Sequence, residues 1–407
     1  MAPPAPPLED PASPGAVLLP LQSESPSMSV RILSTDAVRR ALSIRDLTDP
    51  SSGPHAMQRL VDDVLTALRE AWRCDVRLHR RSPIVSVSDN YDRLRYPPDG
   101  VARDERYTRY VCDTALLRTQ TSAMIPPLLR QLATTPPSPE DVLLACPGLV
   151  YRRDSIDRLH TGEPHQMDLW RVRRGAPLGV EALRHMVETV VRALLPGREW
   201  RVTPARHPYT TDGLQIDVHQ GGEWVEIGEC GLAHPELLAE SGLDTARTSG
   251  LAMGLGMDRL LMLRKGLDDI RLLRAEDPRI HSQMLDLEPY HEVSCMPAVR
   301  RDLSLVLEGD ATSEELGDVV RAALGPQAEV VEAVEVLSET PHEALPPAAV
   351  GRLGISPGQK NVLLRVVLRA LDRSLTHAEC NELRDRIYAA LHRGSAWQWA
   401  SASAPHP

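Results

Sequence analysis

The chain has 407 residues, enough for two or three domains at roughly 100–200 residues each. Hydrophobic residues make up 42% and charged residues 25%, which is typical of a globular protein, and no apolar run approaches the roughly 20 residues that cross a bilayer. The six cysteines are scattered and form no CxxC pair, which excludes a disulfide scaffold and a structural zinc site. We therefore expect a cytoplasmic, reducing compartment and no membrane.

The charge balance of 46 basic and 56 acidic residues gives a net charge of −10, which argues against binding nucleic acid through bulk electrostatics. The lysines are Lys265 and Lys360, so nearly all the positive charge is arginine. A guanidinium group binds phosphate in a bidentate way that an ammonium group cannot. Any polyanion is therefore expected to meet local arginines. The chain also has no phenylalanine.

Composition divides the chain into three parts. Residues 1–28 are rich in proline and alanine and carry too little apolar surface to order, so we expect a disordered tail. This tail has no basic start followed by an apolar run, which argues against a secretory or mitochondrial signal. We expect a first folded domain over residues 29–285 and a second, smaller one over residues 289–400.

The first domain shows the periodicities of both helices and strands. Apolar residues fall at helical spacing over residues 57–72 and again over 180–194. Pro196 and Gly197 are expected to end the second of these helices. Residues 214–218 and 224–227 alternate between apolar and polar, as half-buried antiparallel strands do. The fold class is therefore α+β, with an antiparallel sheet flanked by helices.

The second domain follows a different order of elements. The pattern predicts a strand at 303–307, a helix at 313–324, strands at 329–337 and 362–370, and a second helix with Thr376 and Glu379 as its capping box. The region around Trp397 and Trp399 is a candidate last strand. This order is typical of a ferredoxin-like domain.

Three stretches combine arginines, acids and glycines in a way that suits a nucleotide. They are residues 151–168, residues 224–231, and the glycine-rich residues 250–260. In this order they resemble motifs 2 and 3 of class II aminoacyl-tRNA synthetases, and within that class the catalytic subunit of the phenylalanyl enzyme. The second domain resembles the ferredoxin-fold anticodon-binding domain of the same enzymes, through residues 297–305 and 372–379. Both domains on one chain resemble the single-chain organellar form.

The resemblance implies amino-acid activation with ATP and Mg²⁺, followed by transfer to tRNA. It assigns Arg152 to the α-phosphate and the substrate carboxylate, and Arg259 to the γ-phosphate. Asp154 would orient Arg152 or meet the adenine, His160 would lie along the triphosphate, and Glu226 would hold magnesium. The amino acid would be bound by Gln120, Ser122, Gln166, Asp168, His207, Tyr209, Ala252 and Gly254, with Asp168 supplying the negative charge for the ammonium group.

Several positions depart from the family pattern. The F-P-F stretch of the side-chain pocket is His207-Pro208-Tyr209 here, and Leu251 and Met253 replace the two phenylalanines around Ala252. These changes are expected to weaken selection for a bare phenyl ring and to admit a hydroxylated or more polar side chain. The expected substrate is phenylalanine or a related aromatic amino acid. Glu229 stands where the family usually has glycine.

The partners stay open at this stage. From residue 289 onward 11 basic residues face 16 acidic ones, which predicts weak tRNA binding by charge, although Arg365, Arg369 and Arg373 are candidates for a local basic stripe. The dimer motif survives only in the helix at 57–72 and in Pro83, so a monomer and a homodimer are both open. One alternative is a paralogue that passes the activated amino acid to a small molecule or carrier, and another is a non-catalytic RNA-binding homologue. The absence of phenylalanine fits either synthesis under scarcity of charged phenylalanine tRNA or lineage drift.

Overall fold

The computed structural model describes residues 31–104, 106–135, 140–293 and 296–397. The predicted disordered tail at 1–28 lies outside the described residues, as does most of the candidate last strand around Trp399. Within the described ranges, no helix is long and apolar enough to cross a membrane.

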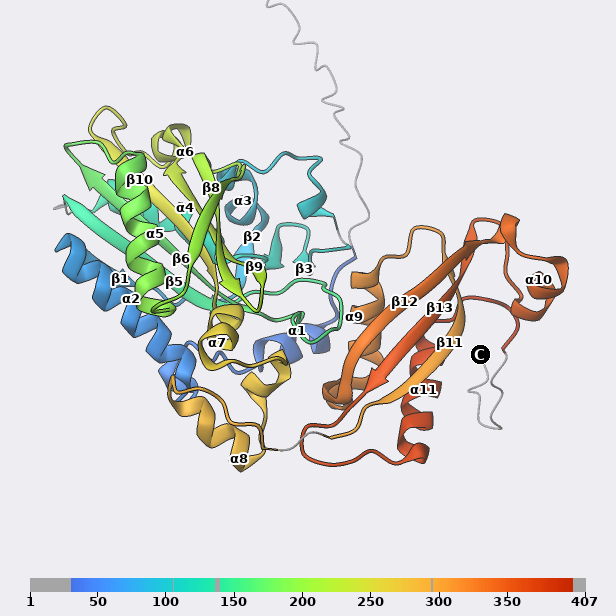
Figure 1. Ribbon diagram of the computed structural model, residues 1–407. Coiled ribbons are helices and arrows are strands. Elements are labelled where there is room, and N and C mark those ends of the chain that lie inside the picture. The colour runs from blue at the N-terminus through green and yellow to red at the C-terminus, as the bar shows by residue number, and fades with distance from the viewer. Residues whose placement is uncertain (1–30, 105, 136–139, 294–295, 398–407) are drawn as a thin grey trace, which may run out of the picture. The chain divides into compact units, whose positions relative to one another are not determined.

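A mostly antiparallel sheet forms the centre of the N-terminal part of the described chain (Figure 1). Over the described residues it has seven strands in the order β1-β5-β6-β10-β9-β8-β7, and only β1 and β5 pair in parallel. The strands are β1 (Asp75–Leu78), β5 (Asp141–Leu149), β6 (His165–Arg174), β7 (Trp200–Pro204), β8 (Thr210–Gln220), β9 (Glu223–Ala233) and β10 (Thr248–Gly256). The predicted strands at 214–218 and 224–227 are confirmed, and they lie within the paired strands β8 and β9.

Helices cover both faces of this sheet. Helices α2 (Ala56–Trp72), α5 (Val180–Leu194) and α7 (Met257–Lys265) share one core with the sheet, and Figure 1 shows α2 and α5 beside it. Helices α4 (Ile125–Thr134) and α6 (Pro235–Glu240) pack on the opposite face. Side chains alternate along a strand, so Met167 and Leu169 of β6 point into the first core while Asp168 and Trp170 point to the other face. The two predicted helices are confirmed.

Shorter elements complete this part of the chain. A small sheet has the order β2-β4-β3. The remaining elements are α1 (Thr35–Leu42), η1 (Pro50–Ser52), β2 (Ile84–Ser86), α3 (Val87–Asn90), η2 (Asp92–Leu94), η3 (Val101–Arg103), β3 (Tyr110–Cys112), β4 (Ala115–Leu117), η4 (Thr121–Met124), η5 (Ile270–Arg274), α8 (Pro278–His281) and η6 (Ser282–Leu285).

The C-terminal region has the predicted order of strands and helices. Its sheet has the order β11-β13-β12, with all pairs antiparallel, and one face packs on α9 and α11. The elements are β11 (Val299–Glu308), α9 (Ser313–Leu324), η7 (Gly325–Val330), β12 (Val331–Pro341), η8 (His342–Ala344), α10 (Pro347–Leu353), β13 (Gln359–Leu368) and α11 (His377–Leu391). Both helices that pack on the sheet begin with a capping box, and the predicted pair of Thr376 and Glu379 forms one of them. The fold class α+β is confirmed.

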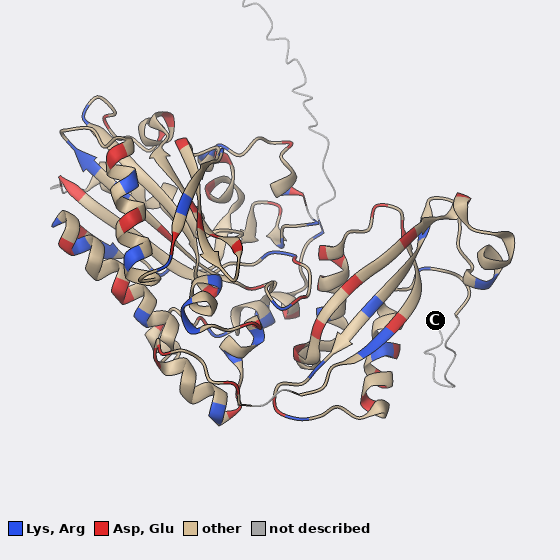
Figure 2. Ribbon diagram, viewed as in Figure 1, with Lys and Arg blue, Asp and Glu red and all other residues tan. Residues whose placement is uncertain are grey.

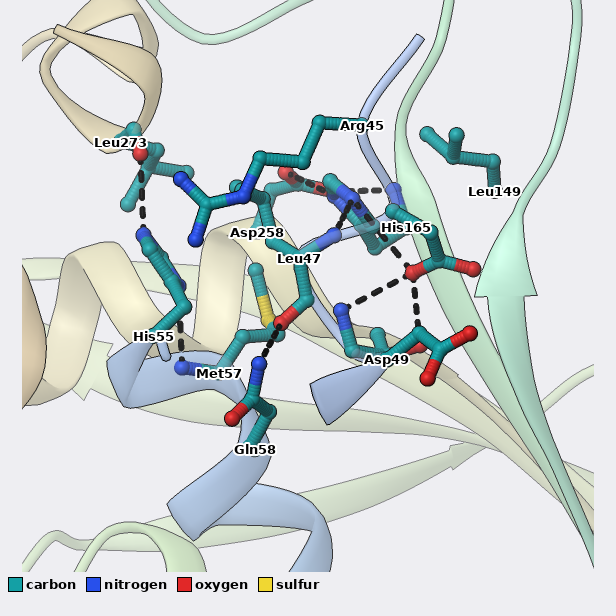
Figure 3. Close-up of polar contacts among 12 residues, drawn as sticks. Arg45, Leu47, Asp49, His55, Met57, Gln58, Leu149, His165, Asp258 and Leu273 are labelled. Carbon is teal, nitrogen blue, oxygen red and sulfur yellow. Dashed lines mark hydrogen bonds and ion pairs between the residues drawn. The ribbon is translucent and has the colours of Figure 1, made fainter. Parts of the chain in front are cut away.

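His55 fixes the start of helix α2 in the core. Its Nδ1 accepts a hydrogen bond from the backbone N–H of Met57 at 3.1 Å, so the proton lies on Nε2, which donates to the carbonyl of Leu273 at 3.0 Å (Figure 3). Burial lowers the pKa of His55 to about 4, although the hydrogen bond to Leu273 opposes this shift. The folded protein therefore holds the neutral ring.

This neutral histidine predicts a loss of stability on acidification. In the unfolded chain His55 takes up a proton near pH 6.5, and in the folded chain only near pH 4. The contribution of neutral His55 to the free energy of unfolding is therefore fully present above pH 6.5 and falls as the pH drops toward 4. The loss in the free energy of unfolding from this one group is about 3 kcal/mol at most. Denaturant unfolding at pH 7, 6, 5 and 4 would measure the loss. His55→Gln is expected to flatten this slope, whereas His185→Gln on the exposed face of α5 is expected to leave it unchanged.

Candidate active site

A cavity of about 450 Å³ opens on the face of the main sheet opposite to α2 and α5. Its walls come from the start of β6, the end of β10, the middle of β9 and the segments after β5 and before α4. The predicted site residues that line it are Arg152, Asp154, His160, Arg259, Gln120, Ser122, Gln166, Asp168, Tyr209, Gly254 and Glu226. The structure thus brings together residues that lie up to 139 positions apart in the chain, from Gln120 to Arg259.

The two arginines assigned to phosphate contacts line the same cavity. Arg152 is exposed in the extended segment after β5. Arg259 lies in the first turn of α7, and its guanidinium donates to the backbone carbonyl of Glu226 at 3.1 Å. This hydrogen bond holds the side chain of Arg259 against strand β9. Two guanidinium groups from different parts of the fold can meet one polyanion here.

A buried histidine and aspartate hold the start of α7 against β6. The backbone N–H and Nδ1 of His165 contact the two carboxylate oxygens of Asp258, the latter at 2.9 Å (Figure 3). Nε2 of His165 accepts from the N–H of Leu47 at 3.0 Å and faces Arg274 at 3.2 Å, so the proton belongs on Nδ1. Although burial opposes it, His165 and Arg274 hold the pKa of Asp258 below its usual range. Asp258 precedes Arg259, so this pair positions the arginine.

Asp154 and His160 lie on the segment between β5 and β6. The carbonyl of Asp154 accepts a hydrogen bond from Arg321 of α9 at 2.7 Å. Nδ1 of His160 lies 2.8 Å from the carboxylate of Asp157, and this hydrogen bond raises the pKa of His160 although partial burial opposes the shift. The ring is thereby favoured in its protonated form, which suits a neighbour of a triphosphate.

Asp168 is the buried carboxylate on the amino-acid side of the cavity. It is 2% exposed and accepts hydrogen bonds from the hydroxyl of Thr121 at 2.7 Å and from Nε1 of Trp170 at 3.0 Å. Burial raises the pKa of Asp168 despite these hydrogen bonds. A cationic ligand would favour the charged carboxylate, so the site suits an ammonium group.

Aromatic rings form one wall of the cavity. The ring of Tyr209 lies 6.0 Å from those of Trp170 and His207, and 6.3 Å from that of Tyr96. Tyr96 lines the cavity and donates from its hydroxyl to Oε1 of Gln120 at 2.8 Å. The aromatic wall is therefore larger than His207 and Tyr209 alone predict. Burial raises the pKa of Tyr209 well above its ordinary value, so its hydroxyl stays protonated.

Two predicted pocket residues do not line the cavity. His207 lies behind its wall, with Nε2 2.8 Å from Oε2 of Glu229. Ala252 is 1% exposed in the core under α4 and α6. Both act on the cavity only through their neighbours in this structure.

Two carboxylates on β9 face the cavity because the strand contains a bulge. Asp217 pairs with Glu226 whereas Ile216 pairs with Gly228, so β9 holds one extra residue there. Glu226 and Glu229 are three positions apart and therefore both line the cavity. Partial burial raises the pKa of Glu226, and the charge of Glu229 adds to this shift while Arg259 opposes it.

These donors fit a magnesium ion that arrives with a nucleotide. In the described chain, no group of three or more His, Cys, Asp or Glu residues could hold a metal ion. A single carboxylate such as Glu226 suits Mg²⁺ when phosphate oxygens and water supply the other ligands. A cation beside Glu226 would also relieve the repulsion from Glu229.

The three arginines of the predicted basic stripe each contact an acidic residue. Arg365 on β13 makes a two-point ion pair with Asp302 of β11 at 2.8 and 2.9 Å. Arg369 contacts Glu332 at 2.5 Å, and Arg373 contacts Glu379 at 2.9 Å. Figure 2 shows acidic as well as basic residues on these strands. The stripe is thus largely neutralised within its own domain, and tRNA binding there stays a prediction.

Local sequence patterns do not identify some of the residues that line or support the cavity. Tyr91, Tyr96 and Tyr107 line the cavity but were not predicted, although Tyr96 directly precedes the Pro97-Pro98 pair. His165 and Asp258 lie 93 positions apart, so their pairing has no signature in local spacing.

Family models match both parts of the chain. The model described as tRNA synthetases class II core domain (F) matches residues 46–284. The chain belongs to this family. A second model, the ferredoxin-fold anticodon binding domain, matches residues 294–397. The catalytic core therefore resembles that of phenylalanyl-tRNA synthetases and is joined to an anticodon-binding type of domain.

Individual relatives agree with this assignment. The chain is 37% identical to a phenylalanine–tRNA ligase alpha subunit of Prochlorococcus marinus (strain MIT 9313) over 194 residues, which are 48% of this chain and 56% of that subunit. It is 28% identical to the chloroplastic/mitochondrial phenylalanine–tRNA ligase of Arabidopsis thaliana over 322 residues, 75% of this chain and 68% of that protein. The match thus spans about half the length of the Prochlorococcus relative.

A solved structure of pyrrolysyl-tRNA synthetase from Desulfitobacterium hafniense aligns with 58% of this chain and 78% of that chain. The TM-score is 0.43 and the sequence identity is 19%.

Proposed function

We propose that the protein activates an aromatic amino acid, phenylalanine or a close relative, with ATP and transfers it to tRNA. The observation that carries this proposal is the convergence of Arg152, Arg259 and Asp168 on one cavity. Two cations suit the phosphates of ATP, and the buried carboxylate suits the ammonium group of an amino acid. The family assignment supports the same reaction class.

In the first step, a carboxylate oxygen of the amino acid attacks the α-phosphorus of ATP. The bond from this phosphorus to the bridging oxygen breaks, and pyrophosphate leaves. Arg152 would contact the substrate carboxylate and the α-phosphate, so it neutralises charge where it develops. Arg259 would hold the γ-phosphate and keep the leaving group in line. Glu226 would hold a magnesium ion that arrives with ATP, and such an ion would supply positive charge to the triphosphate.

The residues on the other side of the cavity would orient the amino acid. Asp168 would bind the ammonium group, with Ser122 and Gln166 as further polar partners. Tyr209 and Tyr96 would contact the aromatic ring. His160 and Asp154 would lie along the nucleotide. In the second step a ribose hydroxyl of tRNA attacks the activated carbonyl, and AMP leaves.

One observation favours a second candidate function, in which the acceptor of the activated amino acid is not tRNA. The arginines of the anticodon-binding type of domain are ion-paired with acids. This pairing favours a paralogue that passes the activated amino acid to a small molecule or carrier. The match to an anticodon-binding domain favours tRNA.

Two assays separate these functions. ATP–pyrophosphate exchange should appear with phenylalanine or a related aromatic amino acid, and acylation of total tRNA should follow with the same amino acid. Exchange without acylated tRNA would favour the paralogue. Absence of exchange with all twenty amino acids and with ring-substituted phenylalanines would overturn the proposed enzyme and leave an RNA-binding homologue.

We further propose domain boundaries at residues 29–285 and 289–400, a cytoplasmic location, and a monomer or homodimer. Sedimentation at several protein concentrations would decide the oligomeric state. The Arabidopsis relative is described as chloroplastic/mitochondrial, so the compartment needs its own localisation experiment.

A further inference from the structure

Glu229 forms the second charged edge of the amino-acid side of the cavity. In the sheet, Asp168 of β6 pairs with Gly254 of β10, and Gly254 pairs with Glu229 of β9. The two carboxylates therefore lie in one row on one face, about 10 Å apart at the backbone, because neighbouring strands are about 4.8 Å apart. Gly254 has no side chain, and an added Cβ there would meet only Oδ1 of Asp168, at 3.8 Å. The space between the two carboxylates is open.

Glu229 has the buried side chain of a histidine and the two tyrosines of the cavity wall as neighbours. Nε2 of His207 lies 2.8 Å from its carboxylate, and the His207 side chain is 8% exposed. The same His207 ring stacks against Tyr209, whose centroid is 6.0 Å away. The negative charge of Glu229 contributes to the raised pKa values of Tyr96 and Tyr209, after burial as the main cause, so it acts on both tyrosines of the wall. Its side chain is 42% exposed, and Glu229 lines the cavity.

An unsubstituted phenyl ring would bind unfavourably beside this carboxylate. A ring over Gly254 would displace water from Glu229 and leave part of its hydrogen-bonding capacity unused. An ionised group that loses water without gaining a donor lowers the affinity of the ligand. A ring substituent with an O–H or N–H group would instead donate to the carboxylate. Sites that hydrogen-bond a substrate group discriminate strongly against the analogue that lacks it.

We propose that Glu229, which lies beside His207, selects an aromatic amino acid whose ring carries a hydrogen-bond donor, a hydroxyl or an amino group. The ammonium group of this substrate lies at Asp168, its ring crosses Gly254, and the ring substituent donates to Glu229. The inference rests on the proposed amino-acid activation at this cavity. It assigns Glu229 to side-chain selection and separates it from the magnesium carboxylate Glu226.

The test compares ATP–pyrophosphate exchange with phenylalanine, tyrosine, 3-hydroxyphenylalanine and 4-aminophenylalanine. The wild-type chain should use at least one of the three substituted amino acids with a kcat/KM at least tenfold above that for phenylalanine. Glu229→Gly should lower the ratio of the kcat/KM for the substituted amino acid to the kcat/KM for phenylalanine at least tenfold, chiefly by raising KM for the substituted amino acid. Glu229→Gln, which keeps an acceptor oxygen, should lower the ratio less. The ratio within one variant does not depend on how much of that protein is folded.

Glu223→Gln, on the exposed start of the same strand, is the matched control and should leave the ratio unchanged. A wild-type preference for phenylalanine, or an unchanged ratio in Glu229→Gly, would overturn the inference while exchange itself still supports the proposed function. A Glu229→Gly effect confined to the magnesium concentration needed for exchange would overturn it too, because it would assign Glu229 to the metal. Absence of exchange with every amino acid would overturn both proposals together.

Discussion

Arg259→Ala is expected to reduce the kcat/KM of ATP–pyrophosphate exchange about 100–1000-fold, the loss typical of removing one preorganised group that stabilises developing charge. Arg259 lines the cavity, and its hydrogen bond within the protein goes to a backbone carbonyl, that of Glu226. The substitution would remove the proposed phosphate contact, and it breaks no ion pair among those found for Arg259 in the described part of the chain. Its free energy of unfolding should stay within about 0.5–1 kcal/mol of the wild-type value.

Measurement of exchange and of denaturant unfolding on the same preparation would check both halves of this prediction. Arg184→Ala is the matched control, because Arg184 is exposed on α5, on the far side of the sheet from the cavity. The control should keep full exchange. A variant at Arg259 that retains more than a tenth of the wild-type rate would contradict the assignment of this side chain to the triphosphate.

Local patterns in the sequence were sufficient to predict much of the fold. Helix α2 buries Leu60, Val64 and Leu68 on one face, and this spacing is visible in the chain. The capping box of Thr376 and Glu379 likewise requires residues only three positions apart. Such signals are local, so they survive without knowledge of the tertiary structure.

The cavity needed information that local patterns lack. The bulge in β9, which turns both Glu226 and Glu229 to the cavity, depends on how that strand pairs with β8. Strict alternation would place these two residues on opposite faces. Tyr96 reaches Gln120 through the fold, and no periodicity connects them. The motif residues were found by family resemblance, whereas the walls between them came only from the structure.

Asp258→Asn is expected to lower both stability and activity. Asp258 is 5% exposed and accepts from the backbone N–H and from Nδ1 of His165, which is itself fully buried. Asparagine keeps the size of the side chain but puts an N–H₂ group where one oxygen accepted a hydrogen bond, and it removes the negative charge that faces Arg274. Breaking a buried charged contact of this kind costs about 3–5 kcal/mol.

The loss of activity should accompany this loss of stability because Asp258 fixes the first turn of α7, which carries Arg259. A shift of that turn by about 1 Å would cost on the order of 100-fold in rate. Denaturant unfolding at pH 7 and exchange kinetics below the unfolding transition would measure the two effects, with Asp62→Asn on the exposed face of α2 as the control. If Asp258→Asn unfolded like the control but still lost exchange, Asp258 would act on the substrate itself and not through the position of Arg259.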